Sequence, residues 1–353
     1  MINIDNVHKI ELEITSDCNA ACPGCARTLN KDILRVNHFT LQDLQRMFPD
    51  ERHIRRKDFR LCGVLGDPAI HPELVPMVEY LLTNGGIVTI STNGGVGPRD
   101  MWYRLGQLSD QYKDNFIMMF CIDGHKETNH IYRVNTKWNI VERNVTAFCE
   151  NSFKEGNNKW VFIVFDHNEH EVEIAKAHAK SLGLKFLIRT GMRNSYFQWT
   201  AEIAKKEARG SVKKEKVKIT TTGDKEHKRK DEVLELDKLI ETNQVDEKVI
   251  NTIVCKYIHE GEIFINSHQE MWPCCFLWDS AFKNKENILE KLSEYQTGWN
   301  SLKHQTIEDV MKHPWYKKVL EESWNPTHSK HLNRCVKSCG FNKAYQNVMV
   351  EQK

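Results

Sequence analysis

The feature that most constrains this chain is a CxxxCxxC spacing, formed by Cys18, Cys22 and Cys25 directly after the strand-like run IELEITS. Three thiolates can bind only three irons of a four-iron cluster, so the fourth iron stays open to a small molecule. A structural zinc site is the alternative, but it usually takes four closing ligands arranged as two CxxC-type pairs. The next cysteine, Cys62, lies far along the chain in another strand-like run. The spacing therefore predicts an iron–sulfur cluster with one open iron.

Bulk composition excludes several classes of protein. The 353 residues suffice for a main domain and a smaller one, and the formal net charge of +2 argues against a protein built to coat nucleic acid. The N-terminal run MINIDNVHKIELEI lacks the apolar core of a signal peptide, and no run approaches the roughly 18 apolar residues of a membrane span. Eleven cysteines in such a chain indicate metal ligands and buried thiols, so we expect a cytoplasmic location.

The first two hundred residues alternate between short apolar runs and amphipathic stretches, which is typical of βα units in a parallel sheet. Helices are expected over 41–47, after the N-cap Thr40, over 72–82 and over 169–182. Six strands with five crossovers predict an α/β fold, a partial (β/α)6 TIM barrel open on one side. Reactive groups gather at the carboxyl ends of such strands. The expected strands are 9–15, 59–64, 87–92, 116–122, 160–165 and 185–189.

A basic stretch over 205–230, including TTTGDKEHKRK, separates this barrel from the rest of the chain. A solvated linker is one interpretation, and an arm that contacts phosphate or nucleic acid is the other. We therefore expect a barrel over 1–200, a charged linker or insertion over 201–250, and a small α+β domain over 251–353. That last part contains a hairpin-like run, EGEIFINSHQEMWPCC, and a helical stretch over 306–323.

Polar motifs follow the expected strands in order along the chain. Gly66, Asp67 and Pro68 follow the second strand, where glycine allows close backbone approach and carbonyl or carboxylate oxygens suit an ammonium group. Thr92 and Asn93 follow the third strand. Asp123 follows the fourth, with Arg133 as a guanidinium suited to a carboxylate, and Asn168 follows the fifth.

The CxxxCxxC loop and this order of motifs resemble the radical S-adenosylmethionine (SAM) enzymes. The resemblance implies that Gly66, Asp67 and Pro68 stand for the GGEP-like element that meets the amino group of SAM, with Asp67 shorter than the usual glutamate. CIDG followed by Arg133 resembles the S-x-D-G…R pattern of the subfamily with SPASM or Twitch domains, with Cys121 replacing the serine. Further cofactor-binding candidates are Thr92, Asn93, Asp123 and Asn168, and Arg133 is the candidate for the SAM carboxylate.

The second group of cysteines resembles a Twitch domain. Cys255 and Cys274 fit the spacing of its opening motif, although Gln269 replaces the expected glycine, and Cys335 and Cys339 match its closing CxxxC. Four thiolates would close an auxiliary 4Fe–4S cluster with no free iron. Cys275 is a spare that could exchange roles with Cys274, and a zinc site on the same four residues is the alternative. We expect Cys62, Cys121 and Cys149 to be buried thiols.

The resemblance implies an oxidoreductase or modifying enzyme that cleaves SAM reductively and abstracts hydrogen from a substrate through a 5′-deoxyadenosyl radical. Implied partners are a one-electron reductant such as flavodoxin or ferredoxin and a peptide, protein or small-molecule substrate. An auxiliary cluster favours oxidation or crosslinking. Modification of a nucleotide or nucleic acid base, and a non-catalytic iron–sulfur protein, stay open as alternatives.

Overall fold

The computed structural model describes residues 3–165, 167–190, 235–242, 244–343 and 348–351. The basic stretch over 205–230 lies outside these residues, so the domain boundaries at 200 and 250 stay predictions. Among the described helices, none combines the length and apolar character that crossing a membrane requires.

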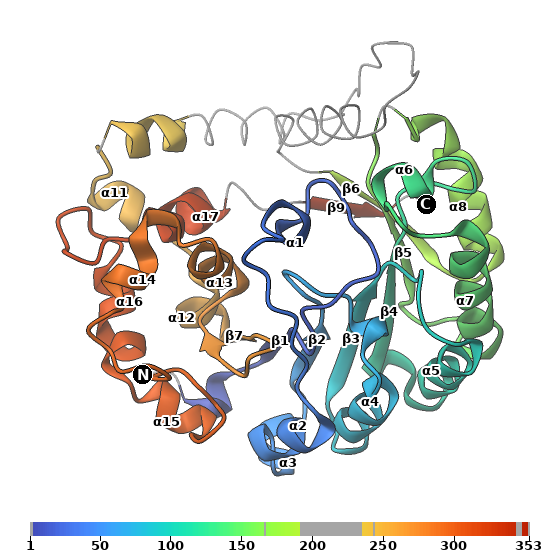
Figure 1. Ribbon diagram of the computed structural model, residues 1–353, viewed down its shortest axis with the longest axis horizontal. Coiled ribbons are helices and arrows are strands. Elements are labelled where there is room, and N and C mark those ends of the chain that lie inside the picture. The colour runs from blue at the N-terminus through green and yellow to red at the C-terminus, as the bar shows by residue number, and fades with distance from the viewer. Residues whose placement is uncertain (1–2, 166, 191–234, 243, 344–347, 352–353) are drawn as a thin grey trace.

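One nine-stranded sheet organises the described chain, in the order β8-β7-β1-β2-β3-β4-β5-β6-β9 (Figure 1). Strands β7 and β1 to β6 run parallel to one another. At the two edges, β8 pairs antiparallel with β7, and β9 pairs antiparallel with β6. The α/β partial barrel is thus confirmed. The strands are Lys9–Leu12 (β1), Asp58–Leu61 (β2), Ile87–Thr92 (β3), Phe116–Cys121 (β4), Lys159–Phe162 (β5), Lys185–Thr190 (β6), Glu262–Ile265 (β7), Met271–Trp272 (β8) and Val348–Glu351 (β9).

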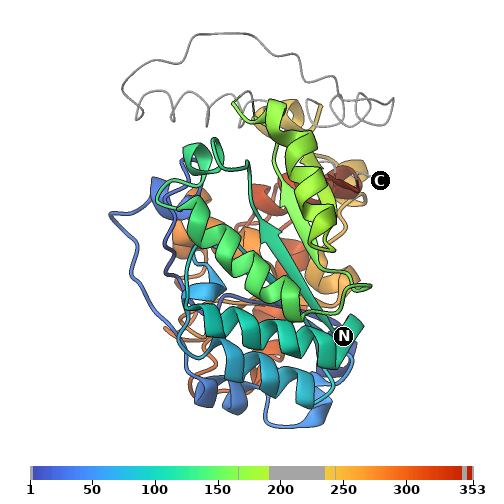
Figure 2. The same ribbon diagram turned by 90° about the vertical axis from the view of Figure 1, so that its right-hand side faces the viewer.

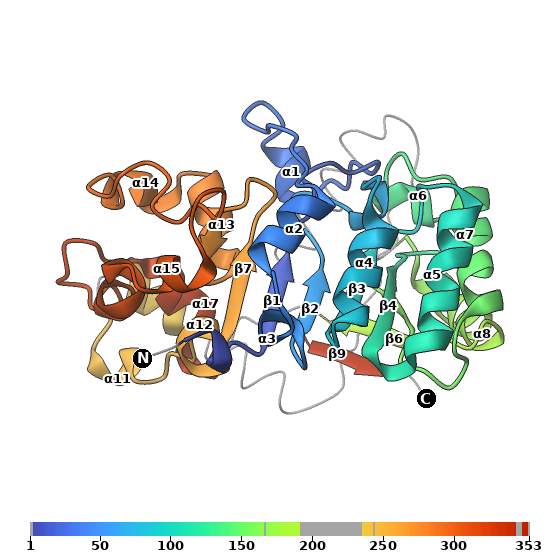
Figure 3. The ribbon, with the colours of Figure 1, turned by 90° about the horizontal axis from the view of Figure 1, so that it is seen from below.

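Helices cover the outer face of this sheet, with α4, α5, α7 and α8 side by side along strands β3 to β6 (Figures 1 and 2). The later helices α11 to α17 gather beyond β7, next to β1 (Figure 3). The helices are Ala26–Leu29 (α1), Leu41–Met47 (α2), Glu51–Ile54 (α3), Leu74–Thr83 (α4), Arg99–Tyr112 (α5), Asn129–Tyr132 (α6), Trp138–Asn151 (α7), Val172–Ser181 (α8), Glu247–Ile250 (α11), Lys256–Glu260 (α12), Cys275–Phe282 (α13), Ile288–Lys291 (α14), Ile307–Met311 (α15), Leu320–Glu322 (α16) and Asn333–Lys343 (α17).

Strand β4 shows how the sequence separates the two faces of the sheet. Phe116, Met118 and Phe120 are buried, and Phe120 packs edge-on against Phe148 of α7. The alternate residues Ile117, Met119 and Cys121 are only half-buried. Because side chains of a strand point to opposite faces in turn, the aromatic set builds the core under the helices. The other set faces the concave side of the sheet.

The predicted hairpin over 260–275 is confirmed as β7 and β8, which pair antiparallel, but the prediction did not include its place in the barrel sheet. Strand β7 extends the barrel sheet by pairing in parallel with β1, with Lys9 opposite Glu262 and Leu12 opposite Ile265. Gln269 in the connecting turn has φ of 63°, so it takes the left-handed conformation that the expected glycine would favour. The turn is therefore retained without the glycine.

Candidate active site

The cysteine loop between β1 and α1 is held by the ends of two other strands. Ala21 donates its backbone N–H to the Val134 carbonyl over 2.9 Å, and Asp67 donates to the Asp17 carbonyl over 2.8 Å. Within the loop, the Cys25 N–H donates to the Cys22 carbonyl over 3.0 Å. These bonds fix the loop between the segments that follow β2 and β4, at the carboxyl ends of the strands.

The three thiols of this loop lie close enough to influence one another. Burial raises the pKa of Cys18 to about 12, and the charges of Asp67, Cys22 and Cys25 add to this increase. Burial likewise raises the pKa of Cys22 to about 11, against the opposing charge of Arg133. Both thiols therefore hold their protons at neutral pH, and binding of iron must release those protons.

The donor set of the loop consists of three thiols. A structural zinc site usually takes four closing ligands, whereas three thiolates bind three irons of a four-iron cluster and leave the fourth open. The chemistry of the donors is thus compatible with the predicted cluster, and the cluster itself stays a prediction.

Asp67 directs its side chain into the protein at the end of β2. It is 5% exposed, and it accepts hydrogen bonds from the Ala69 N–H over 3.0 Å, the Thr92 hydroxyl over 2.7 Å and the Asn93 N–H over 2.7 Å. The carboxylate therefore ties β2 to the end of β3. The Asp67 backbone is engaged as well, since its N–H donates to the Asp17 carbonyl and its carbonyl accepts the Ile70 N–H over 3.1 Å. A contact between the predicted element and SAM therefore stays a prediction.

Gly66 is required by a close approach of two backbone segments. A Cβ atom at this position would lie 1.9 Å from the Thr15 carbonyl oxygen. Pro68 follows as the first residue of a short 3-10 helix, Pro68–Ile70, which Asp67 caps. The segment after β2 is thereby pressed against the start of the cysteine loop.

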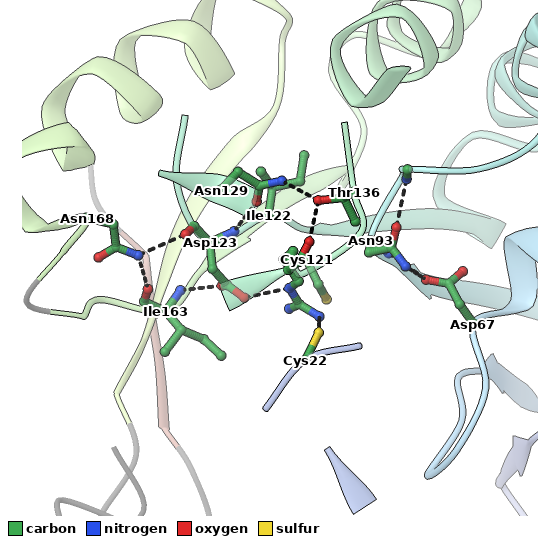
Figure 4. Close-up of polar contacts among 12 residues, drawn as sticks. Cys22, Asp67, Asn93, Cys121, Ile122, Asp123, Asn129, Thr136, Ile163 and Asn168 are labelled. Carbon is green, nitrogen blue, oxygen red and sulfur yellow. Dashed lines mark hydrogen bonds and ion pairs between the residues drawn. The ribbon is translucent and has the colours of Figure 1, made fainter. Parts of the chain in front are cut away.

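Asn93 links Asp67 to the first cysteine. Its side-chain Nδ2 donates to Asp67 Oδ2 over 2.6 Å (Figure 4). The same nitrogen donates to Asn19 Oδ1 over 3.0 Å and lies 3.8 Å from the Cys18 sulfur. Its Oδ1 accepts the Gly95 N–H over 2.8 Å. The amide orientation is therefore fixed on both sides, with the donor facing the sulfur.

Asp123 and Arg133 form a comparable pair after β4 (Figure 4). Asp123 is fully buried and accepts hydrogen bonds from Arg133 Nε over 2.7 Å and from the Ile163 N–H over 2.8 Å. Arg133 Nη1 lies 3.8 Å from the Cys22 sulfur. Burial opposes the charge of Arg133, but the Asp123 carboxylate outweighs it and raises the pKa of Arg133 above its usual range.

Asn168 braces the ends of β4 and β5. Its Nδ2 donates to the carbonyls of Asp123 and Ile163, each over 2.9 Å, and its Oδ1 accepts the Phe165 N–H over 2.6 Å. Asn168 is also fully buried, and the hydrogen bonds of its side chain go to backbone groups. A contact with a nucleoside stays a prediction.

The four cysteines predicted to hold the auxiliary cluster line one pocket in the C-terminal part. Cys255, Cys274, Cys335 and Cys339 are each between 6% and 8% exposed, and the pocket wall also includes Lys256, Trp324 and Arg334. Cys275 is absent from that wall and faces Glu11 and Lys256 instead. The geometry thus groups Cys274, and not the spare, with the other three.

Sequence reasoning missed the charged residues around β1. Glu262 is fully buried and accepts from Lys9 over 2.6 Å and from Lys256, and Lys256 also lies 3.6 Å from Glu11. Glu13 is buried farther along the same face of the chain. The alternation of Lys9, Glu11 and Glu13 with apolar residues was the available signal, because it marks a polar concave face.

Comparison with known proteins identified no matching family model and no matching curated protein. Among solved structures, Streptococcus suis SuiB bound to the precursor peptide SuiA superposes with a TM-score of 0.52 at 12% identity, covering 89% of this chain and 66% of that one. SuiB bound to S-adenosylmethionine gives 0.50 at 10% identity, with 79% and 64% covered. This chain thus spans just under two thirds of SuiB. At these identities the likeness concerns the fold alone, and the chain shares the fold of SuiB over the covered residues.

Proposed function

We propose that this chain is a radical SAM enzyme. Cys18, Cys22 and Cys25 would hold a four-iron cluster, and SAM would lie beside its open iron at the mouth of the barrel. The observation that carries the proposal is the cysteine loop itself, three thiols fixed by backbone bonds between the ends of β2 and β4. The SAM-bound SuiB structure, which shares the fold, supports it.

The cluster would supply one electron for the cleavage of SAM, and this chain's residues would position the reactants. The backbone at Gly66 and Asp67 would offer carbonyl groups for the SAM ammonium. Arg133 would donate terminal N–H groups of its guanidinium to the SAM carboxylate, while its Nε–H stays bonded to Asp123. Thr92 and Asn168 would act through the backbone segments that they hold.

A second cluster on Cys255, Cys274, Cys335 and Cys339 is part of the proposal. Their shared pocket supports it, and four thiolates would leave no open iron for a substrate. Such a closed cluster suits electron transfer, which favours a net oxidation or a crosslink of the substrate.

We propose a peptide, a protein side chain or a small metabolite as the substrate. The SuiB structure with its precursor peptide supports the peptide class. A one-electron reductant such as flavodoxin or ferredoxin would be the protein partner. Modification of a nucleotide or nucleic acid base is the alternative, and it rests on the basic stretch over 205–230, which lies outside the described residues.

Anaerobic reconstitution with iron and sulfide tests the proposal. The wild-type protein should bind iron and sulfide and, with dithionite, release 5′-deoxyadenosine from SAM. Cys22→Ala should abolish that release, whereas Cys149→Ala, a buried thiol on α7, should retain it. Undiminished SAM cleavage in the Cys22 variant would overturn the assignment, and zinc in place of iron would favour a structural metal site.

The auxiliary site is tested with a matched pair of neighbouring cysteines. Cys274→Ala should lose about half of the bound iron. Cys275→Ala, whose thiol faces away from the pocket, should keep all of it. Equal iron content in the two variants would contradict the second cluster.

A further inference from the structure

Two buried carboxylates each hold a hydrogen-bond donor against one cysteine of the loop. The first set starts at Asp67 after β2, continues through Asn93 and ends at Cys18. Asn93 is 4% exposed and makes two bonds to the same carboxylate oxygen of Asp67, from its backbone N–H over 2.7 Å and from Nδ2 over 2.6 Å. Nδ2 also donates to Asn19 Oδ1 over 3.0 Å, so the Cys18 sulfur at 3.8 Å shares one of its two hydrogens with a shorter bond.

The second set starts at Asp123 after β4, continues through Arg133 and ends at Cys22. The Nε–Oδ2 bond of 2.7 Å orients the guanidinium, and its carbon lies 5.5 Å from the centre of the Tyr132 ring. With the group held from two sides, Nη1 points to the Cys22 sulfur at 3.8 Å. Figure 4 labels Asp123 and Cys22 of this set, and Asp67 and Asn93 of the first one.

The two sets differ from ordinary loop bonding because their donors come from other segments of the chain. Cys18 also accepts the Ala20 N–H over 3.4 Å, which is a local contact within the loop. Asn93 instead directly follows β3, and Arg133 directly follows α6. The described residues give the Cys25 sulfur no corresponding side-chain donor, so the three cysteines are not equivalent.

Hydrogen bonds to cluster sulfurs are among the features that set the reduction potential of an iron–sulfur cluster. A donor stabilises the more negative, reduced state, and the positive charge of Arg133 adds to that effect. We propose that Asn93 and Arg133 are positioning residues that raise the reduction potential of the cluster on Cys18, Cys22 and Cys25. The proposal rests on the proposed cluster, but not on SAM cleavage.

The test is a redox titration of the reconstituted protein without SAM, followed by electron paramagnetic resonance and by iron analysis. Asn93→Leu keeps the side-chain shape and removes the donor, and Arg133→Leu removes the second donor. Each should shift the midpoint potential to more negative values at unchanged iron content of the loop cluster, and the double variant should shift it further. Arg133→Lys should restore part of the shift, because a donor and its charge return.

Thr92→Val is the matched control. Thr92 bonds to the same Asp67 carboxylate over 2.7 Å, and within the described part of the chain it makes no hydrogen bond to a cysteine. A merely structural role of Asp67 would therefore move the potential in this variant as well. A potential that is unchanged in both leucine variants, or shifted equally in T92V, would overturn the inference. Where a leucine variant loses its cluster, Asn93→Ser, with a shorter side chain, and Arg133→Gln, without the positive charge, carry the same measurement. Absence of iron from the wild-type protein would instead overturn the proposed function.

Discussion

Glu13 is a buried carboxyl group in the extended segment between β1 and the cysteine loop. It is 1% exposed, and its Oε2 accepts the Leu65 N–H over 2.8 Å. Within the described residues, its Oε1 has no hydrogen-bond partner. Burial raises the pKa of Glu13 from about 4.5 to about 7. The protonated form therefore dominates in the folded protein up to nearly neutral pH.

This shift makes stability depend on pH. Between pH 4.5 and 7 the folded state binds one more proton at Glu13 than the unfolded state, so the free energy of unfolding falls as pH rises. The full effect is at most about 3 kcal/mol. Glu13→Gln removes the titrating group. The free energy of unfolding of this variant, relative to that of wild type, should therefore rise from pH 5 to pH 8. Urea unfolding of the metal-free proteins measures this, and parallel pH profiles would contradict it.

Single residues also show how far sequence reasoning reached at the site. Residue order predicted that Asp67, Asn93, Asp123 and Arg133 would meet near the cysteine loop, and they do. The sequence could not reveal which group each side chain would hydrogen-bond. Asp67 and Asn168 occupy turns that suited a ligand, yet their polar atoms satisfy buried backbone and side-chain groups. Burial decided this, because unsatisfied polar groups are costly inside a protein.

At the scale of elements, the segment joining β2 to the following 3-10 helix depends on Gly66. Gly66→Ala would place a Cβ 1.9 Å from the Thr15 carbonyl oxygen, so one of the two backbone segments must move. We expect a loss of stability of about 1–3 kcal/mol or more, together with reduced iron binding at the cysteine loop. Thermal unfolding and iron analysis measure the two effects.

Gly340→Ala provides the control, since its Cβ would lie 3.5 Å from the nearest atom, an ordinary contact, within α17. A Gly66→Ala variant as stable as this control would show that the two backbone segments separate without cost.

Elements with a strong local signal were predicted well. Strand β3 has the expected bounds, and α2 begins after Thr40, whose side chain accepts the Asp43 N–H over 3.1 Å. The expected strand over 9–15 proved shorter because its second half stays extended without the full ladder, with one bond from the Glu13 N–H to Ile265. The helical stretch expected over 306–323 is present but divided into α15, the π-helical turn Trp315–Val319 and α16. Pro314 lacks an N–H and interrupts the stretch between α15 and the π-helical turn.

For the whole molecule, the contact between β1 and β7 joins the early and late parts of the chain. Glu262 at this contact is fully buried between Lys9 and Lys256. Glu262→Gln would leave two ammonium groups facing a neutral partner, and breaking a buried pair in this way costs about 3–5 kcal/mol. Chemical denaturation should show this loss.

The exposed ion pair of Arg52 with Asp5 offers a comparison. Asp5→Asn should change the stability little, because solvent screens such a pair. Similar losses in the two variants would mean that the Glu262 network does not join the two parts.

The pairing of residues 9–12 with residues 262–265 had no local signal in the sequence. Parallel strands need no shared turn, so nothing adjacent in the chain marks them as partners. Composition and periodicity predicted a barrel and a separate hairpin. Only the assembled sheet shows that the hairpin completes the barrel edge.

Strands β7 and β8 close one edge of the sheet, and β9 closes the other. All three follow β6 in the chain, so the ribosome makes them after β1 to β6. While residues up to Thr190 leave the ribosome, β1 and β6 present open backbone edges to any neighbouring nascent chain. Such edges invite pairing between molecules. Assembly of this barrel is therefore expected to finish only after translation has passed Glu351, and slow elongation through the C-terminal third would prolong the exposure.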